Sequence, residues 1–134
     1  MVHPKLIIVL LLSLLASCVS VSEMRKMDKF EETSKAYEFA IRWSDFESAS
    51  LFLKTEENAT VSDLLNKLKQ FKVTAYTIKN FLPSKDKSQV LLIAEISYFE
   101  LNRLIVKSIS DRQIWKYDTA QERWLLTSGL PDFK

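Results

Sequence analysis

The sequence predicts an α+β domain in which three N-terminal helices pack on a bent four-stranded antiparallel meander sheet. Up to residue 70, apolar side chains recur at three- and four-residue spacing, which indicates amphipathic helices. From residue 73 they alternate with polar side chains, which indicates strands. Because helical and strand segments do not alternate along the chain, the helices are expected to lie together on one face of an antiparallel sheet.

The three predicted helices are marked by periodicity and by one capping pattern. The first covers residues 23–43, and the third covers residues 61–70. Between them, Ser44 and Glu47 have the spacing of a capping box, which places the start of a short second helix at Ser44. The apolar stripe of the first helix includes Met27, Phe30, Tyr37 and Ile41.

The four predicted strands are rich in β-branched and aromatic residues. A polar loop with Pro83 separates the first two strands, and tight turns near Asn102 and Asp118 separate the others. The predicted strands cover residues 73–82, 90–99, 104–117 and 123–128.

The start of the chain has the layout of a secretory signal peptide. A lysine precedes an apolar run over residues 6–15, and small residues follow the run. The run is about half the roughly 20 residues that a membrane-spanning helix needs, so removal is favoured over retention. The segment Leu15-Ala16-Ser17-Cys18 resembles the lipobox of bacterial lipoproteins.

The lipobox resemblance implies cleavage before Cys18 and attachment of a diacylglycerol to its sulfur. Each buried CH₂ contributes about 0.8 kcal/mol, so an anchor of two or three chains holds stably. The predicted organisation is a signal peptide at residues 1–17, a tether at 18–22 and a single domain at 23–134. In enterobacterial lipoproteins an aspartate after the cysteine favours the inner membrane, so with Val19 there the resemblance implies the periplasmic face of the outer membrane. The alternatives are an ordinary signal peptide, whose removal releases the domain, and a retained membrane helix.

Composition excludes several kinds of chemistry from the mature domain. The one histidine, His3, and the one cysteine, Cys18, lie in the predicted leader or at its cleavage site. The domain therefore lacks the side chains for His-dependent catalysis, thiolate or imidazole zinc sites and disulfides. A single glycine, Gly129, cannot make a glycine-rich phosphate loop. With a formal net charge of +2 there is no basic excess for nucleic acid, and we expect no metal, cofactor or nucleic-acid partner.

The predicted helices and strands together resemble the nuclear transport factor 2-like superfamily, in which a long helix and two shorter ones pack into a bent sheet to form a cone. The likeness lies in residues 37–43 of the first helix and in the last two strands. There an aromatic-ended strand, residues 112–118, turns into a returning strand led by Trp124. Members of the superfamily include isomerases, dehydratases and binding or assembly modules, so the fold does not select a function.

One face of the third strand carries the candidate site. Alternation places Asp111, Gln113 and Trp115 on this face, with Tyr76 of the first strand as a neighbour if the face lines the cone. A carboxylate in an apolar pocket can act as an acid or base, which makes Asp111 and Tyr76 the catalytic candidates. The binding candidates are Asp111, Gln113 and Trp115. Two alternatives give these residues no chemistry: a β-bulge near Ser110 that turns them to water, or hydrogen bonds that satisfy them inside the fold.

Two functions compete at this point. The first is a non-enzymatic, lipid-anchored module that binds an envelope protein or a small apolar ligand. The second is a metal-free acid–base enzyme of the isomerase or dehydratase kind, centred on Asp111. A closed aromatic pocket around a desolvated Asp111 favours the enzyme, and a filled interior favours binding.

Overall fold

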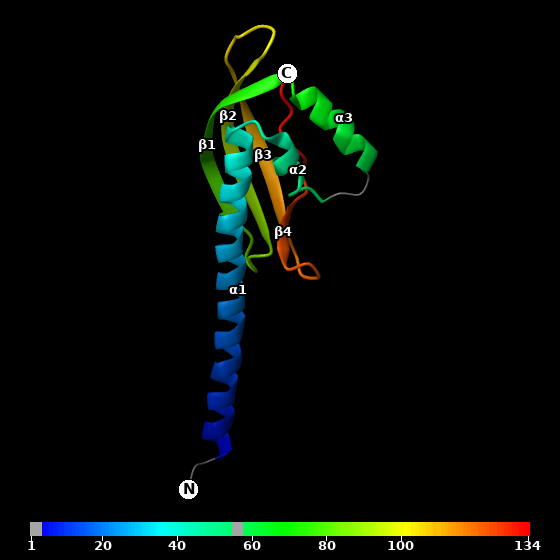
Figure 1. The fold of residues 1–134 in the computed structure, drawn as a ribbon. Helices are drawn as coiled ribbons and strands as arrows, with labels where there is room; N and C mark the ends of the chain where they lie inside the picture. Colours follow the sequence, from blue (N-terminus) through cyan, green and yellow to red (C-terminus); the bar gives the residue numbers. More distant parts are fainter. Residues whose placement is uncertain (1–3, 55–57) are drawn as a thin grey trace.

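The computed structural model describes residues 4–54 and 58–134, with side chains described for residues 21–54 and 60–134. In this part of the chain, three helices precede four strands (Figure 1). The helices are α1 (Pro4–Arg42), α2 (Phe46–Ser50) and α3 (Asn58–Leu68). The strands are β1 (Phe71–Pro83), β2 (Gln89–Glu100), β3 (Lys107–Asp118) and β4 (Arg123–Leu126).

The strands form one antiparallel sheet in the order β1-β2-β3-β4, which confirms the α+β class and the four-stranded antiparallel sheet. The third strand starts later than predicted, at Lys107. The reason is the pairing with β2, which begins on the β3 side at Lys107, opposite Tyr98. Residues 101–106 therefore form a loop between β2 and β3.

The helix α1 is longer than the predicted residues 23–43, because it runs unbroken from Pro4 to Arg42. Its C-terminal half lies along the sheet, and its N-terminal part extends beyond the rest of the domain (Figure 1). The backbone of the predicted tether is part of this helix. The predicted lipobox and its Cys18 lie outside the residues whose side chains are described. Within the described residues, no helix combines the length and apolar character needed to cross a membrane.

The predicted capping box at Ser44 is wrong, because Asp45 is the N-cap of α2. Asp45 Oδ1 accepts a hydrogen bond from the Ser48 N–H at 3.1 Å, and its Oδ2 accepts from the Ser48 hydroxyl at 2.6 Å. Ser44 instead has φ 58°, and its Oγ accepts a hydrogen bond from the Val73 N–H at 2.9 Å. This serine therefore ties the end of α1 to the start of β1.

Bulges occur in β1 and not in β3. The pairing of β1 with β2 shifts register around Thr74 and again around Lys79. The pairing of β2 with β3 has no shift, so the expected alternative of a β-bulge near Ser110 is wrong. Strict alternation keeps the odd-numbered residues from Asp111 to Trp115 on one face of the sheet.

Aromatic rings hold α1 onto the sheet. Phe30 lies edge-on to Trp115 and Trp124, with ring centroids 6.0 and 5.1 Å apart. Tyr37 is edge-on to Trp115 at 5.2 Å. The Trp124 Nε1–H also donates a hydrogen bond to the Lys26 carbonyl at 2.8 Å. The last two strands are therefore joined to α1 by apolar packing and by a hydrogen bond.

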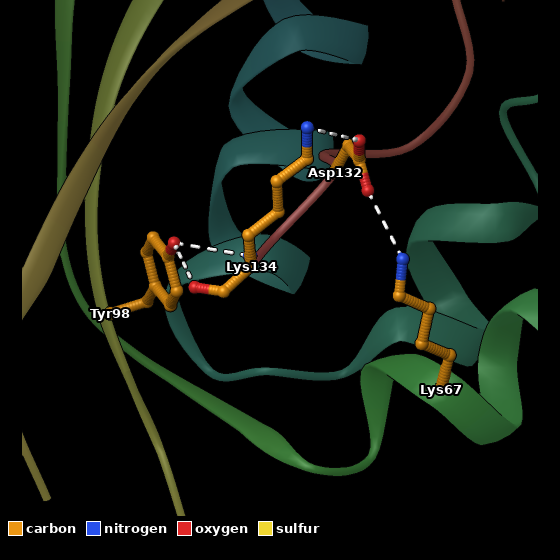
Figure 2. Close-up of polar contacts among 4 residues, drawn as sticks. All are labelled: Lys67, Tyr98, Asp132 and Lys134. Carbon is orange, nitrogen blue, oxygen red and sulfur yellow. Dashed lines mark hydrogen bonds and ion pairs between the residues drawn. The ribbon is translucent and has the colours of Figure 1, made fainter. Parts of the chain in front are cut away.

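The last residues of the chain form a tail that closes one end of the core. Phe133 is fully buried and packs on Tyr98, with centroids 4.5 Å apart, and on one phenylalanine each from α2 and β1. The Tyr98 hydroxyl donates to the backbone oxygen of Lys134 at 2.9 Å and accepts from its N–H at 3.2 Å (Figure 2). Asp132 adds an ion pair to Lys67 of α3 at 3.2 Å. The tail thus connects the sheet to two helices.

Trp124→Ala should lower the free energy of unfolding by about 3–5 kcal/mol, because the ring is 1% exposed and its hydrogen bond to α1 is lost. Trp43→Ala is the matched control, since that ring is 68% exposed and its removal should cost less than about 0.5 kcal/mol. Urea denaturation followed by circular dichroism measures both. A loss below about 1 kcal/mol for Trp124→Ala would show that the ring lies outside the core.

Candidate functional site

The four predicted site residues lie together on the face of the sheet that α1 covers. Asp111, Gln113 and Trp115 occupy alternate positions of β3, and Tyr76 reaches them from β1 across β2. Ala94 is the β2 residue opposite Asp111. Its small side chain leaves space between the strands for the longer polar groups.

Gln113 is the centre of the cluster, and it is 1% exposed. Its Oε1 accepts a hydrogen bond from the Trp115 Nε1–H at 3.0 Å. Its Nε2 donates to the Tyr76 hydroxyl and to Asp111 Oδ2, both at 2.9 Å. Because an indole N–H can only donate, Trp115 determines which end of the amide faces it. The amide nitrogen is thereby directed to the carboxylate and the phenol.

Tyr37 is a further member of the cluster that the sequence predicts only as part of an apolar stripe. The residue is fully buried, and its hydroxyl has no hydrogen-bond partner in the described part of the chain. Burial raises the pKa of Tyr37 well above its usual value, and charge on Asp111 and on Tyr76 adds to the rise. The hydroxyl therefore lies within electrostatic reach of both groups. The sequence signal that could have indicated this role is the position of a tyrosine inside an apolar stripe. A hydroxyl that becomes buried there needs a polar partner nearby.

Burial also changes the acidity of the polar residues in the cluster. It raises the pKa of Asp111, and the hydrogen bond from Gln113 opposes part of this rise. The pKa of Tyr76 is raised by burial as well, again against the opposing hydrogen bond from Gln113. A carboxyl whose pKa is raised holds its proton closer to neutral pH, which is a requirement of acid–base chemistry. The two phenols remain protonated at neutral pH.

Asp111 is the most exposed member of the cluster, because Gln113, Trp115, Tyr76 and Tyr37 are all buried. Asp111 is half-buried and lies on the part of β3 that β4 does not cover, since their pairing reaches only to Trp115. Three hollows of about 660, 490 and 310 Å³ are found on the described surface, and residues outside the cluster line all three. None of these hollows leads to the carboxylate.

The hollow of about 490 Å³ lies between α2, the C-terminal end of α3 and the adjoining ends of β1 and β2. We call it the distal groove, because these elements lie at the end of the domain opposite the N-terminal part of α1 (Figure 1). Its volume falls within the range of about 300–1,000 Å³ that is usual for ligand sites. Its apolar lining consists of Phe46, Leu65, Phe71, Phe99 and Leu101.

Charged side chains surround the distal groove. Lys69 and Lys72 line it, and neither forms an ion pair with a described residue. Asp45 and Glu47 line the α2 side. The Asp45 carboxylate is already engaged by Ser48, and these hydrogen bonds lower its pKa. The groove therefore combines an apolar floor with two cations and one carboxylate, Glu47, that form no ion pair among the residues whose side chains are described.

Within the described residues, no group of three or more His, Cys, Asp or Glu side chains is placed to hold a metal ion. Comparisons of the chain with protein-family models, with curated proteins and with solved structures found no match. The functional argument therefore rests on the contacts within the chain.

Asp111→Asn should change how stability depends on pH. The raised pKa of Asp111 means that its carboxyl favours the folded state while protonated, and that this contribution is lost as the pH rises through the folded-state pKa. The wild type should therefore lose stability relative to Asp111→Asn between about pH 4, the value for an unfolded Asp, and pH 7. Urea denaturation at a series of pH values measures the difference.

Tyr37→Phe is the control for this experiment. Its phenol does not ionise in that range, so the variant should follow the pH profile of the wild type. If the difference between the wild type and Asp111→Asn stayed constant or moved in the opposite direction, the Asp111 carboxyl would not be desolvated in solution.

Proposed function

We propose that this chain is a lipid-anchored, non-enzymatic binding module of the bacterial cell envelope, built on the cone of the nuclear transport factor 2-like superfamily. Its three helices and bent sheet form the cone, and Cys18 carries the lipid. The periplasmic face of the outer membrane is the expected location, from the Val19 that follows the cysteine. The bound partner is an envelope protein or a small apolar ligand.

The observation that carries the binding proposal is the contrast between the Gln113 cluster and the distal groove. All hydrogen-bonding ends of the Gln113 amide are used within the cluster, and aromatic rings fill the space around it. The distal groove, in contrast, is open to the surface and is lined by apolar side chains. An apolar floor with a few polar groups is the usual character of a binding site.

The form of α1 supports the anchored arrangement. The helix is continuous from Pro4 to Arg42, so a lipid at Cys18 and the domain are joined by one helix. From residue 18 to the end of α1 this helix spans about 36 Å, at 1.5 Å per residue. The two bulges of β1 support the bent sheet of the cone, because bulges bend a strand. The tail supports the cone because it closes one end of the core.

An acid–base enzyme is the second candidate, and one observation favours it. The Tyr37 hydroxyl, which has no partner in the described part of the chain, lies in the same cluster as Asp111, whose pKa is raised. Buried polar groups without partners are rare and sometimes mark catalytic sites. Chemistry at Asp111 requires a path for substrate, and the three hollows described above do not supply one.

Cys18→Ser should abolish the lipid anchor. In a bacterial host, the wild type should partition into detergent and show, by mass spectrometry, a diacylglycerol on residue 18, whereas the variant should stay in the aqueous phase. Ser22→Ala, outside the lipobox, is the control and should partition as the wild type does. Equal partitioning of Cys18→Ser and the wild type would contradict the anchor.

The groove should bind 1-anilinonaphthalene-8-sulfonate, an apolar anion that fits both the floor and the two lysines. The double variant Leu65→Ser/Phe99→Ser removes two of the apolar contacts, and it should weaken saturable binding by about tenfold or more, which corresponds to about 1.4 kcal/mol. Phe39→Ser is the control, since Phe39 is 66% exposed on α1 and does not line the groove. Dye fluorescence measures the affinities. Equal weakening in both variants would refute binding in the groove.

A further inference from the structure

The loop between β2 and β3 exposes a group of aliphatic side chains. We call residues 101–106 the distal loop. In Figure 1 it is the yellow segment that projects beyond the sheet, at the end of the domain opposite the N-terminal part of α1. The exposed fractions are 52% for Leu101, 70% for Leu104, 62% for Ile105 and 62% for Val106. Contiguous exposed apolar groups of this kind mark an interaction surface.

Backbone hydrogen bonds give the distal loop a defined shape. The Leu101 N–H donates to the Gln70 carbonyl at 2.9 Å. The Arg103 and Leu104 N–H groups both donate to the Glu100 carbonyl at 3.0 Å. The apolar side chains are therefore presented by an ordered turn.

Packing within the domain does not explain the residue at position 104. Leu104 has φ 53°, in the left-handed region that favours glycine and asparagine. A leucine here is strained, and its 70% exposed side chain gains little from burial in return. The apolar side chain is thus better suited to a contact outside the chain.

The chemistry of the distal loop fits a lipid surface better than a protein partner. Its exposed apolar residues are all aliphatic, and its one exposed arginine, Arg103, is paired with Glu100 of the same chain. Protein interfaces obtain most of their binding energy from Trp, Tyr and Arg, whereas Leu and Val are under-represented. The loop also projects outward, which suits insertion between lipids. Aliphatic residues next to basic ones are typical of segments that lie at the headgroup boundary of a membrane.

The charges around the distal loop have a basic excess. Glu100 and Arg103 form an ion pair at 3.7 Å, so their charges cancel and the pair adds no net charge. Lys107 follows the loop, and its Nζ donates to the backbone oxygen of Lys134 at 3.0 Å. Lys69 and Lys72 line the adjoining distal groove together with Leu101, and the carboxylates of Asp45 and Glu47 line its α2 side. Lysines at the base of an apolar loop attract anionic headgroups.

We propose that the distal loop inserts its aliphatic side chains into the surface of a bilayer that contains anionic lipid. The proposal is independent of the lipid on Cys18, because it depends on residues at the other end of the domain. It shares Leu101, Lys69 and Lys72 with the lining of the distal groove, whereas residues 104–106 do not line the groove and separate the two proposals.

The test uses the full chain with Cys18→Ser, since Cys18 is the only cysteine. Asn102→Cys then places a single thiol in the loop for an environment-sensitive fluorophore, without removing an aliphatic side chain. Vesicles of phosphatidylcholine with phosphatidylglycerol should raise the emission several-fold, and spin-labelled lipids should quench it. Vesicles of phosphatidylcholine alone should have a weaker effect.

Two variants and one control site make the result specific. Leu104→Ser/Ile105→Ser should abolish the response, and Lys69→Glu/Lys72→Glu should weaken vesicle affinity by about tenfold or more. A fluorophore at Leu51→Cys, a position that is 71% exposed at the C-cap of α2, should not respond. The proposal is overturned if the loop fluorophore ignores vesicles or if the position 51 fluorophore responds equally. It is also overturned if the loop signal rises with protein concentration in the absence of lipid, which would indicate a protein–protein contact.

Discussion

The contact of α1 with Trp115 and Trp124 is the interaction on which the rest of the structure depends. Phe30 and Tyr37 meet these rings edge-on, and the Trp124 N–H bonds to the α1 backbone. The same Trp115 determines the orientation of the Gln113 amide, because its N–H can only donate. The position of one aromatic ring thus decides both how the helix is docked and how the polar cluster is arranged.

The buried groups around Asp111 are compatible with a catalytic role or with a purely structural one. A carboxyl among phenols and an amide can exchange protons with a substrate, or it can simply complete the hydrogen bonds of a core. Gln113 hydrogen-bonds the Asp111 carboxylate, and the three hollows described above are lined by other residues of the described part of the chain. The Tyr37 hydroxyl has no hydrogen-bond partner among the described residues, whereas a purely structural cluster should satisfy it.

Features that depend on local periodicity could be predicted from the sequence. Alternation is enough to place Asp111, Gln113 and Trp115 on one face, and a meander order brings Tyr76 near them. Contacts between distant segments left no such pattern. Ser44 bonds to a backbone N–H 29 residues away, so the sequence favoured a local capping role that Asp45 has instead. The packing of the tail, with Phe133 in the core, likewise depends on the assembled sheet and helices.

The single helix α1 has a consequence for a protein attached to a membrane at residue 18. A flexible linker would let residue 18 and the domain turn independently, whereas a continuous helix fixes the direction in which residue 18 points relative to the domain. Phe30, the first fully buried ring of α1, follows Cys18 by about three turns, or about 18 Å. Adding or removing one residue in that stretch would rotate the domain by about 100° relative to residue 18. A change of seven residues would nearly restore the original orientation and would change only the distance between residue 18 and the domain. If residue 18 is the attachment point, the number of residues in this stretch therefore sets which side of the domain lies in line with it.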